Sequence, residues 1–392
     1  MEEWKEYKLG DFMEFNPKIK LAKDTLARKI TMDQLIPHCR DIHSWTYEPY
    51  LGGAKFENGD TIMARITPCL ENGKHAYVSC LDKGEVAYGS TEYIVIRGRK
   101  DISDNAFVYY LSHYPNFKNA AIKSMVGTSG RQRAQVDVLE NLIMTLPSLG
   151  EQRIIARFLK SLDDKIEVNR KINENLEQQA QTLFKSWFVD FEPFKNGKFV
   201  ESELGMIPKG WRVGSLFDVA EIFDKKRKPL SGKERENMDK IYPYYGATSC
   251  MDYVDNYLFD GIYTLIGEDG SVAKENGFPY MQYVWGKFWV NNHAHILQGK
   301  NGFSTEMIHV FLSMTNIQHL VTGAVQAKLS QANMQKISLP IPSKDIVDNI
   351  RPRINVMYEK KRILEQESRR LAEIRDTLLP KLMSGQIKVN EI

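Results

Sequence analysis

Residues 155–187 read IARFLKSLDDKIEVNRKINENLEQQAQTLFKSW and carry the most regular apolar pattern of the chain. Polar Asn169 and Asn173 interrupt an otherwise regular pattern of apolar side chains spaced alternately four and three residues apart. A repeat of 3.5 residues over four heptads predicts a coiled-coil helix rather than a globular surface helix. The apolar positions are Ile155, Leu159, Leu162, Ile166, Leu176, Ala180, Leu183 and Trp187.

The same frame returns 195 residues later, where Lys361, Ser368 and Arg375 are the polar interruptions. Two helices of about 38 residues, at ~1.5 Å per residue, would each be nearly 60 Å long. We therefore expect an antiparallel coiled coil that acts as a rod, although two unrelated amphipathic surface helices would also fit. The residues expected to pair the helices are Leu162, Ile166, Leu176, Leu183, Met357, Leu364, Leu371 and Leu378.

The segments before the two helices also repeat. Trp4, Leu9, Asp11 and Glu14 recur 207 residues later as Trp211, Leu216, Asp218 and Glu221. Short strand-like runs separated by Gly, Asn and Asp turns predict that each segment is a mixed α/β (α+β) head. The predicted order is a first head at 1–146, a central helix at 147–190, a second head at 191–342 and a C-terminal helix at 343–392.

Charge and composition exclude several classes of protein. The 392 residues carry 53 Lys+Arg and 50 Asp+Glu, a net charge of +3 that excludes a histone-like polycation and a charge-driven membrane binder. The chain contains no apolar run of about eighteen residues, so we expect no membrane span. Four cysteines in so long a chain indicate a reducing compartment, which predicts a cytoplasmic protein.

Motifs for common enzyme chemistry are missing. Gly232-Lys233 is followed by Glu234 rather than by the Ser or Thr of a P-loop, and no Gly-x-Gly-x-x-Gly follows a strand. His293 and His295 could offer two metal ligands from one face of a strand, but no neighbouring Cys or acidic cluster completes a set. Local hydrogen bonding, or a DNA-facing position, suits these histidines better. We therefore expect a protein without catalytic activity.

Local basic clusters favour nucleic acid even though each head is nearly neutral. Residues 1–146 contain 19 Lys+Arg and 19 Asp+Glu, and residues 189–340 contain 16 and 17. Clusters at 97–100, 130–133 and 225–228 could contact phosphates, although solvated surface charge fits each of them equally well. The candidate DNA-binding residues are Lys74, Arg97, Arg99, Arg131, Gln132, Arg133, Lys226, Arg227, Gln326 and Lys328.

Several stretches resemble one known family. LPSLGEQR at 146–153, SLDDKIEVNR at 161–170 and LFKSWFVDF at 183–191 are similar to the central region of type I restriction–modification specificity subunits. TPCLENGK at 67–74, GSTEY at 89–93 and TGAVQAKL at 322–329 resemble recurring phrases of the same family. The resemblance covers essentially the whole chain, in the family's order of head, helix, head, helix.

The resemblance implies a DNA-binding, non-catalytic subunit of a prokaryotic complex, associated with the nucleoid. Each head would be a target-recognition domain that reads one half of a split, asymmetric double-stranded DNA sequence. The helices would dock two methyltransferase subunits, which bring S-adenosylmethionine, and two motor-nuclease (restriction) subunits could add ATP and Mg chemistry. This chain itself would bind no cofactor.

Two other interpretations of the sequence stay open. One is a coiled-coil scaffold whose heads bind proteins rather than DNA; the other is a self-sufficient restriction or methyltransferase enzyme, which the missing motifs disfavour. The first head also departs from the family's phrase: it has GTSGRQR at 127–133 where the second head has TGAVQAK. Whether Arg131 corresponds to Gln326 or to Lys328 is open from the sequence.

Overall fold

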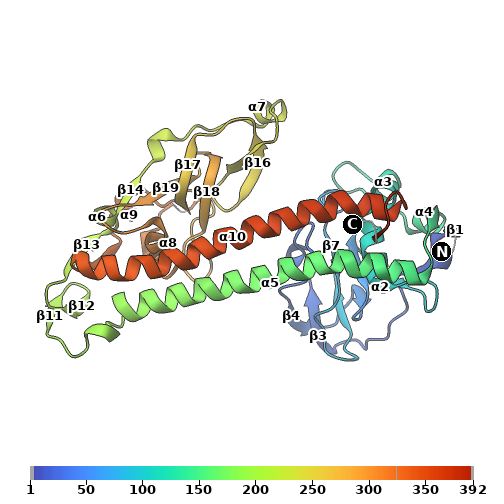
Figure 1. Cartoon of the computed structure of the whole chain (residues 1–392), viewed down its shortest axis with the longest axis horizontal. Coiled ribbons are helices and arrows are strands. Elements are labelled where there is room, and N and C mark those ends of the chain that lie inside the picture. Colours follow the sequence, from blue (N-terminus) through green and yellow to red (C-terminus); the bar gives the residue numbers. More distant parts are fainter. Residues whose placement is uncertain (1–3, 324, 390–392) are drawn as a thin grey trace. The chain divides into compact units, whose positions relative to one another are not determined.

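The protein, seen here as a computed structural model that describes residues 4–323 and 325–389, divides into two compact units (Figure 1). Unit 1 contains the chain up to Arg170 and again from Glu365 onward, and unit 2 contains Lys171–Leu364. Each unit therefore combines one head with a part of each long helix. The predicted four-segment division stays a prediction.

The head of unit 1 is built on two four-stranded sheets. The first has the strand order β2-β9-β6-β7, the second has the order β4-β3-β8-β5, and β1 pairs separately with β10. The strands are β1 Lys5–Lys8, β2 Met13–Phe15, β3 Leu26–Ile30, β4 Thr46–Pro49, β5 Ala54–Phe56, β6 Thr61–Ala64, β7 His75–Tyr77, β8 Ala87–Gly89, β9 Tyr93–Gly98 and β10 Ile143–Leu146. The helices are α1 Leu9–Phe12, η1 Met32–Gln34, α2 Asn105–His113, α3 Pro115–Lys123 and α4 Val136–Glu140.

The head of unit 2 is built on one six-stranded sheet with the order β14-β19-β17-β18-β15-β16. Its strands are β11 Phe199–Ser202, β12 Gly205–Pro208, β13 Arg212–Ser215, β14 Ala220–Ile222, β15 Tyr242–Tyr245, β16 Cys250–Val254, β17 Phe259–Gly267, β18 Met281–Val290, β19 Ala294–Gly299 and β20 Ser338–Ile341. Its helices are η2 Glu192–Phe194, α6 Leu216–Val219, η3 Asp224–Lys226, α7 Gly232–Glu236, α8 Thr305–Ser313, η4 Gln318–Leu320 and α9 Gln331–Met334.

The two heads share one framework, as the repeat predicts. The order β2-β9-β6-β7 in unit 1 matches β14-β19-β17-β18 in unit 2, and both sets are antiparallel throughout. The pair β1-β10 likewise matches β13-β20, and α2 and α8 lie against the equivalent strands of their heads (Figure 1). The heads differ in the outer strands, which form a separate sheet in unit 1 and extend the main sheet in unit 2.

The predicted long helices are α5 (Leu149–Phe188) and α10 (Lys344–Met383), each of 40 residues. Their contacts within each unit run antiparallel, because later residues of α5 meet earlier residues of α10. In unit 1 Arg375 Nη1 lies 2.6 Å from Asp163 Oδ1, and Asn169 Nδ2 donates to Ser368 Oγ at 3.2 Å. In unit 2 Lys361 Nζ lies 2.9 Å from a carboxylate oxygen of Glu177.

The predicted interface between the two long helices, which we call the seam, is more polar than its apolar spacing suggested. Of the eight residues expected to pair the helices only Leu364 is buried, whereas the other seven are half-buried. The polar interruptions Asn169 and Arg375 are themselves buried and bond across the pair. The ends of the helices instead bury apolar side chains in the head cores, for example Leu159 in unit 1 and Phe184 in unit 2.

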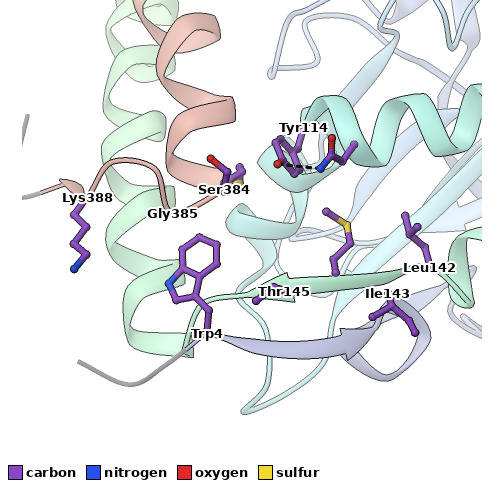
Figure 2. A pocket seen from close by; sticks show the side chains of 11 residues that line it. Trp4, Tyr114, Leu142, Ile143, Thr145, Ser384, Gly385 and Lys388 are labelled. Atoms are coloured by element: carbon purple, nitrogen blue, oxygen red, sulfur yellow. Dashed lines mark hydrogen bonds between the residues drawn. The ribbon is translucent and has the colours of Figure 1, made fainter.

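Both described ends of the chain meet in unit 1. Trp4 Nε1 donates to Glu151 Oε2 at 3.0 Å, and the Trp4 ring lies beside Gly385 at the end of α10 (Figure 2). Gly385 has a φ of 72°, and a Cβ there would approach the indole to 3.4 Å. Together they border a cavity of about 630 Å³ whose wall includes residues 142–145. Among the helices in the described part of the chain, none is long and apolar enough to cross a membrane.

Candidate nucleic-acid interface

In the first head, two loops pair at the end of β6. An antiparallel bridge from Ile66 to Arg133 joins the loop after β6 to the loop at 126–133, and a bridge from Val126 to Arg133 closes the second loop on itself. The Thr67 amide donates to Gln132 O at 3.0 Å, and the Gln132 amide donates to Thr67 Oγ1 at 3.1 Å. The result is a short, pinned hairpin at 126–133, which we call recognition loop 1.

The second head contains the same arrangement at the end of β17. Residues 322–323 and 325–328, which we call recognition loop 2, are closed by a bridge between Thr322 and Lys328, and Lys328 also bridges to Asp269. The Gly270 amide donates to Ala327 O at 2.9 Å, as the Thr67 amide does to Gln132 O in the first head. Since both loops end in a bridged basic residue, Arg133 corresponds to Lys328, and the shared spacing of 195 residues then relates Arg131 to Gln326.

Each loop turns at a glycine that only glycine suits. Gly127 has a φ of 138° and Gly323 has a φ of 95°, a region that L side chains rarely adopt. A Cβ on Gly323 would also collide with the carbonyl oxygen of Gln326. These glycines leave the side chains of Arg131 and Gln326 exposed.

Four of the predicted DNA-binding residues of the first head meet at this end of the sheet. Arg131 is exposed, whereas Gln132 and Arg133 are half-buried. The Arg133 guanidinium forms an ion pair with Glu92, the closest approach being 2.6 Å between Nη2 and Oε1. Lys74 ends the neighbouring loop, and its Nζ donates to Met32 O at 2.7 Å.

Arg97 and Arg99 lie at the opposite end of β9. In the antiparallel pair of β9 with β6, Ala64 faces Tyr93 whereas Thr61 faces Ile96, so Arg97 lies beyond the start of β6. The Arg97 guanidinium binds both carboxylate oxygens of the buried Asp60, at 2.6 and 2.8 Å. Its positive charge is thus compensated within the head, which argues against a strong contact of Arg97 with DNA. The contact of Arg97 and Arg99 with DNA stays a prediction.

Arg99 is exposed but also locally engaged, since its guanidinium donates to Gly10 O at 2.7 Å. The predicted basic DNA-binding residues of the first head therefore form two groups at opposite strand ends rather than one continuous patch. Only the group around recognition loop 1 has a counterpart around recognition loop 2.

In the second head, Gln326 and Lys328 are exposed on recognition loop 2. Lys328 Nζ lies 3.5 Å from Glu268 Oε1, and about half of its side chain remains accessible. Lys226 is exposed, with its ammonium 5.1 Å from the centre of the Phe223 ring. Arg227 instead turns inward, to Glu268 Oε2 at 2.5 Å.

Arg227 belongs to a buried polar network that includes one of the two histidines considered as metal ligands. His295 Nδ1 lies 2.5 Å from Asp224 Oδ2 and 3.6 Å from Glu268 Oε2. Within the described residues, Asp224, Glu268 and His295 are the one set of three potential ligands whose atoms lie within 4.8 Å of one another. His293 instead lies against Asp269, with its Nδ1 facing Asp269 Oδ1.

The chemistry of this set suits a protein ion network better than a metal. The Arg227 guanidinium already supplies a cation, at 2.5 Å from Glu268 and 3.5 Å from Asp224. The remaining ring nitrogen of His295, Nε2, faces Leu329 O at 2.6 Å. Burial alone would raise the pKa of Asp224, but the hydrogen bond and charge of His295 lower it, with help from the Ile296 amide and Arg227.

The residues that bond to the recognition loops from within each head were not predicted from the sequence. Arg65, Glu92 and Glu268 are not among the predicted site residues, yet each bonds to a recognition loop or to the residue that follows it. Asp224, also not predicted, bonds to His295 and Gln331. The available signal was positional: Arg65 and Glu268 directly follow the strands β6 and β17, at the same point of the repeat.

The chain matches one known protein family in sequence. The family model described as "Type I restriction modification DNA specificity domain" matches residues 1–178 and again residues 208–370. The chain therefore belongs to the family of type I restriction–modification specificity subunits and carries the family's domain twice.

Known relatives agree. The chain is 28% identical to the MjaIX specificity subunit of Methanocaldococcus jannaschii, over 75% of this chain and 71% of that protein. It is 26% identical to the HindI specificity subunit of Haemophilus influenzae, over 99% of this chain and all of the relative. A further specificity subunit of Haemophilus influenzae is 37% identical over 147 residues, and the chain spans only 37% of its length.

A solved structure shares the fold. The type I restriction–modification S subunit from M. genitalium superimposes with a TM-score of 0.54 at 16% sequence identity, covering 97% of this chain and 96% of that one. This likeness shows a shared fold. Family, fold class and tandem repeat thus match what the sequence predicted.

Proposed function

We propose that this chain reads a bipartite, asymmetric sequence in double-stranded DNA, each head recognising one half. The observation that carries the proposal is the duplicated loop pair. Both heads present a pinned recognition loop at the same end of the sheet, with an exposed polar residue, Arg131 or Gln326, two positions before its basic anchor. One loop geometry used twice suits two half-sites read by one mechanism.

The exposed side chains have the chemistry for such reading. A guanidinium such as that of Arg131 can bind O6 and N7 of guanine, and an amide such as that of Gln326 can bind N6 and N7 of adenine. The ion pairs of Arg133 with Glu92 and of Lys328 with Glu268 fix the loop ends while leaving part of each cation accessible to phosphate. The near-neutral heads fit a reader that shares its grip on DNA with partner subunits.

We further propose that the helices dock two methyltransferase subunits. Both carry exposed apolar side chains, which mark interaction surfaces when they gather on one face. Val168 on α5 is 48% exposed and Ile363, at the equivalent position of α10, is 50% exposed. Ile172 and Val356 are exposed one and two turns away on the same faces. An internal repeat would thereby offer two equivalent surfaces to one kind of partner.

In this proposal the chain binds no cofactor and performs no catalysis, and the complex acts in the cytoplasm. S-adenosylmethionine belongs to the methyltransferase subunits, and ATP and Mg belong to two restriction subunits where these are present. Duplex DNA is the other partner, and no membrane is involved.

Binding of the assembled complex to duplex DNA tests the proposal. The chain is co-expressed with its cognate methyltransferase subunit, and affinity for DNA that contains or lacks the methylated sequence is measured between about 50 and 200 mM salt. We expect specific binding whose log Kd rises steeply with log[salt]. Equal, salt-insensitive affinity for all duplexes would contradict it and would favour the protein-binding scaffold.

The docking surfaces need a separate experiment. Val168→Asp together with Ile363→Asp should abolish co-purification with the methyltransferase subunit. The matched control, Lys171→Asp with Gln366→Asp, changes exposed polar positions of the same helices and should leave the complex intact. Equal effects of both pairs would contradict the proposed surfaces.

A further inference from the structure

Each recognition loop is followed by a buried residue whose backbone is held on both sides. These residues are Ala134 in the first head and Leu329 in the second, and both are fully buried. The Ala134 amide donates to Arg65 O, and the Leu329 amide donates to Glu268 O, both at 2.8 Å. The two amides therefore make the same bond at equivalent strand ends.

The carbonyl groups of the same two residues accept bonds from different side chains. Ala134 O accepts from Arg65 Nη2 at 3.1 Å. Leu329 O accepts from His295 Nε2 at 2.6 Å. Arg65 directly follows β6, whereas His295 lies on β19, so the two heads make the same contact from different elements of the shared framework.

His295 is itself held firmly. Its side chain is 1% exposed, and its Nδ1 lies 2.5 Å from Asp224 Oδ2. Asp224 in turn accepts from the Ile296 amide at 3.0 Å and from Gln331 Nε2 at 2.7 Å. Both ring nitrogens of His295 thus face oxygen atoms, Asp224 Oδ2 and Leu329 O. Glu268 and Arg227 complete the charged groups around it.

We propose that His295, held by Asp224, is the positioning residue of recognition loop 2, and that Arg65 performs this role for recognition loop 1. Each donates from a buried position to the carbonyl of the residue after the loop, and so fixes the direction in which the loop leaves the sheet. We call this bond to the carbonyl the clamp. Lys328 directly precedes Leu329, and Gln326 lies two residues before Lys328. A shift of the Leu329 carbonyl would therefore move both exposed side chains.

The consequence for specificity rests on the proposed function. Base reading requires side chains to be held within about 0.5 Å of a productive geometry. A loop released at one end would still carry its charge and contact phosphates, but it would discriminate bases poorly. Loss of the clamp should therefore reduce discrimination in one half-site while overall binding to DNA persists.

Two substitutions of His295 separate the clamp from general damage to the core. In His295→Gln the amide reaches where Nε2 lies, so a donor to Leu329 O is kept and the bond to Asp224 is lost. In His295→Asn the shorter side chain reaches only where Nδ1 lies, so the bond to Asp224 is kept and the clamp is lost. Each variant thus retains one of the two bonds.

The first readout is the ratio of methylation rates, by the assembled complex, for cognate DNA and for DNA with single-base changes in either half. We expect His295→Asn to lose about tenfold or more of its discrimination in one half only, and His295→Gln to lose much less. Arg65→Leu should have the corresponding effect in the other half. Equal behaviour of the two His295 variants, or equal loss in both halves, would overturn the positioning role.

The second readout does not require DNA. Amide hydrogen exchange of residues 322–331 in the chain should accelerate in His295→Asn relative to His295→Gln, with no change in recognition loop 1. Unchanged exchange would overturn the clamp itself. If exchange accelerates in His295→Asn as expected but the wild-type complex methylates no bipartite sequence, the proposed function is contradicted and the clamp is not.

Discussion

The buried ion pair between the long helices gives the sharpest test of the helix pairing in unit 1. Asp163 accepts from Arg375 Nη1 at 2.6 Å and from the Tyr110 hydroxyl at 2.6 Å, and the Arg375 and Asp163 side chains are 9% and 4% exposed. Burial alone would lower the pKa of Arg375, but the charges of Asp163 and Asp376 raise it. The contact is therefore made by a buried, charged pair.

The perturbation is Arg375→Met, which keeps an unbranched, flexible stem but removes the guanidinium and leaves Asp163 buried without its cation. Breaking a buried pair from one side costs about 3–5 kcal/mol. The matched control is Lys195→Ala, which breaks the exposed pair of Lys195 with Glu192, whose side chains are 58% and 50% accessible. That pair contributes about 0–1 kcal/mol.

Urea unfolding of the purified chain, followed by circular dichroism, measures both changes, and hydrogen exchange of residues 155–170 locates them. We expect Arg375→Met to lower the free energy of unfolding by several times the effect of Lys195→Ala. The double variant Asp163→Leu/Arg375→Met should recover most of the loss, because no charge then remains buried alone. An Arg375→Met effect no larger than that of Lys195→Ala would refute the pairing.

Three other predictions follow from the sites described. Gly323→Ala should reduce specific DNA binding by about tenfold or more without unfolding unit 2, because the loop cannot accept a Cβ at that φ; binding titrations and circular dichroism check this. Arg131→Ala should relax base preference in one half-site, whereas Arg97→Ala should destabilise the first head and leave base preference unchanged, as methylation mapping and urea unfolding would show. Burial lowers the pKa of His75 to about 3 and the pKa of His113 well below its usual value. As the pH falls through about 6.5, protons therefore bind mainly to the unfolded chain. Acidification from pH 7 to 5 should thus destabilise unit 1 by about 2 kcal/mol for each of these two histidines. Hydrogen exchange at both pH values measures this loss.

The sequence predicted the architecture well because duplication and periodicity leave direct marks in it. The 3.5-residue spacing located both long helices, and the repeat of Trp4 as Trp211 marked equivalent points of the two heads. The same spacing overstated how apolar the seam is, since Asn169 and Arg375 bond across it instead of merely interrupting it.

The site was only partly predictable, because sequence clusters ignore which strand end a residue occupies. Arg97 and Arg133 looked alike as members of basic runs, but β9 places Arg97 beside Asp60, at the end of the sheet opposite to Arg133. The clamp on Leu329 was beyond sequence reasoning, since it joins His295 and Asp224 from segments 71 residues apart.

Mapping of adenine methylation in DNA treated with the assembled complex asks whether each head reads one half of the target. Two versions are compared: the wild-type chain, and a chain in which only residues of recognition loop 2 are replaced. We predict one bipartite motif with a fixed gap for the wild-type chain, and a motif changed in one half alone for the variant. A single contiguous motif, or a change in both halves at once, would contradict the assignment of one half-site to each head.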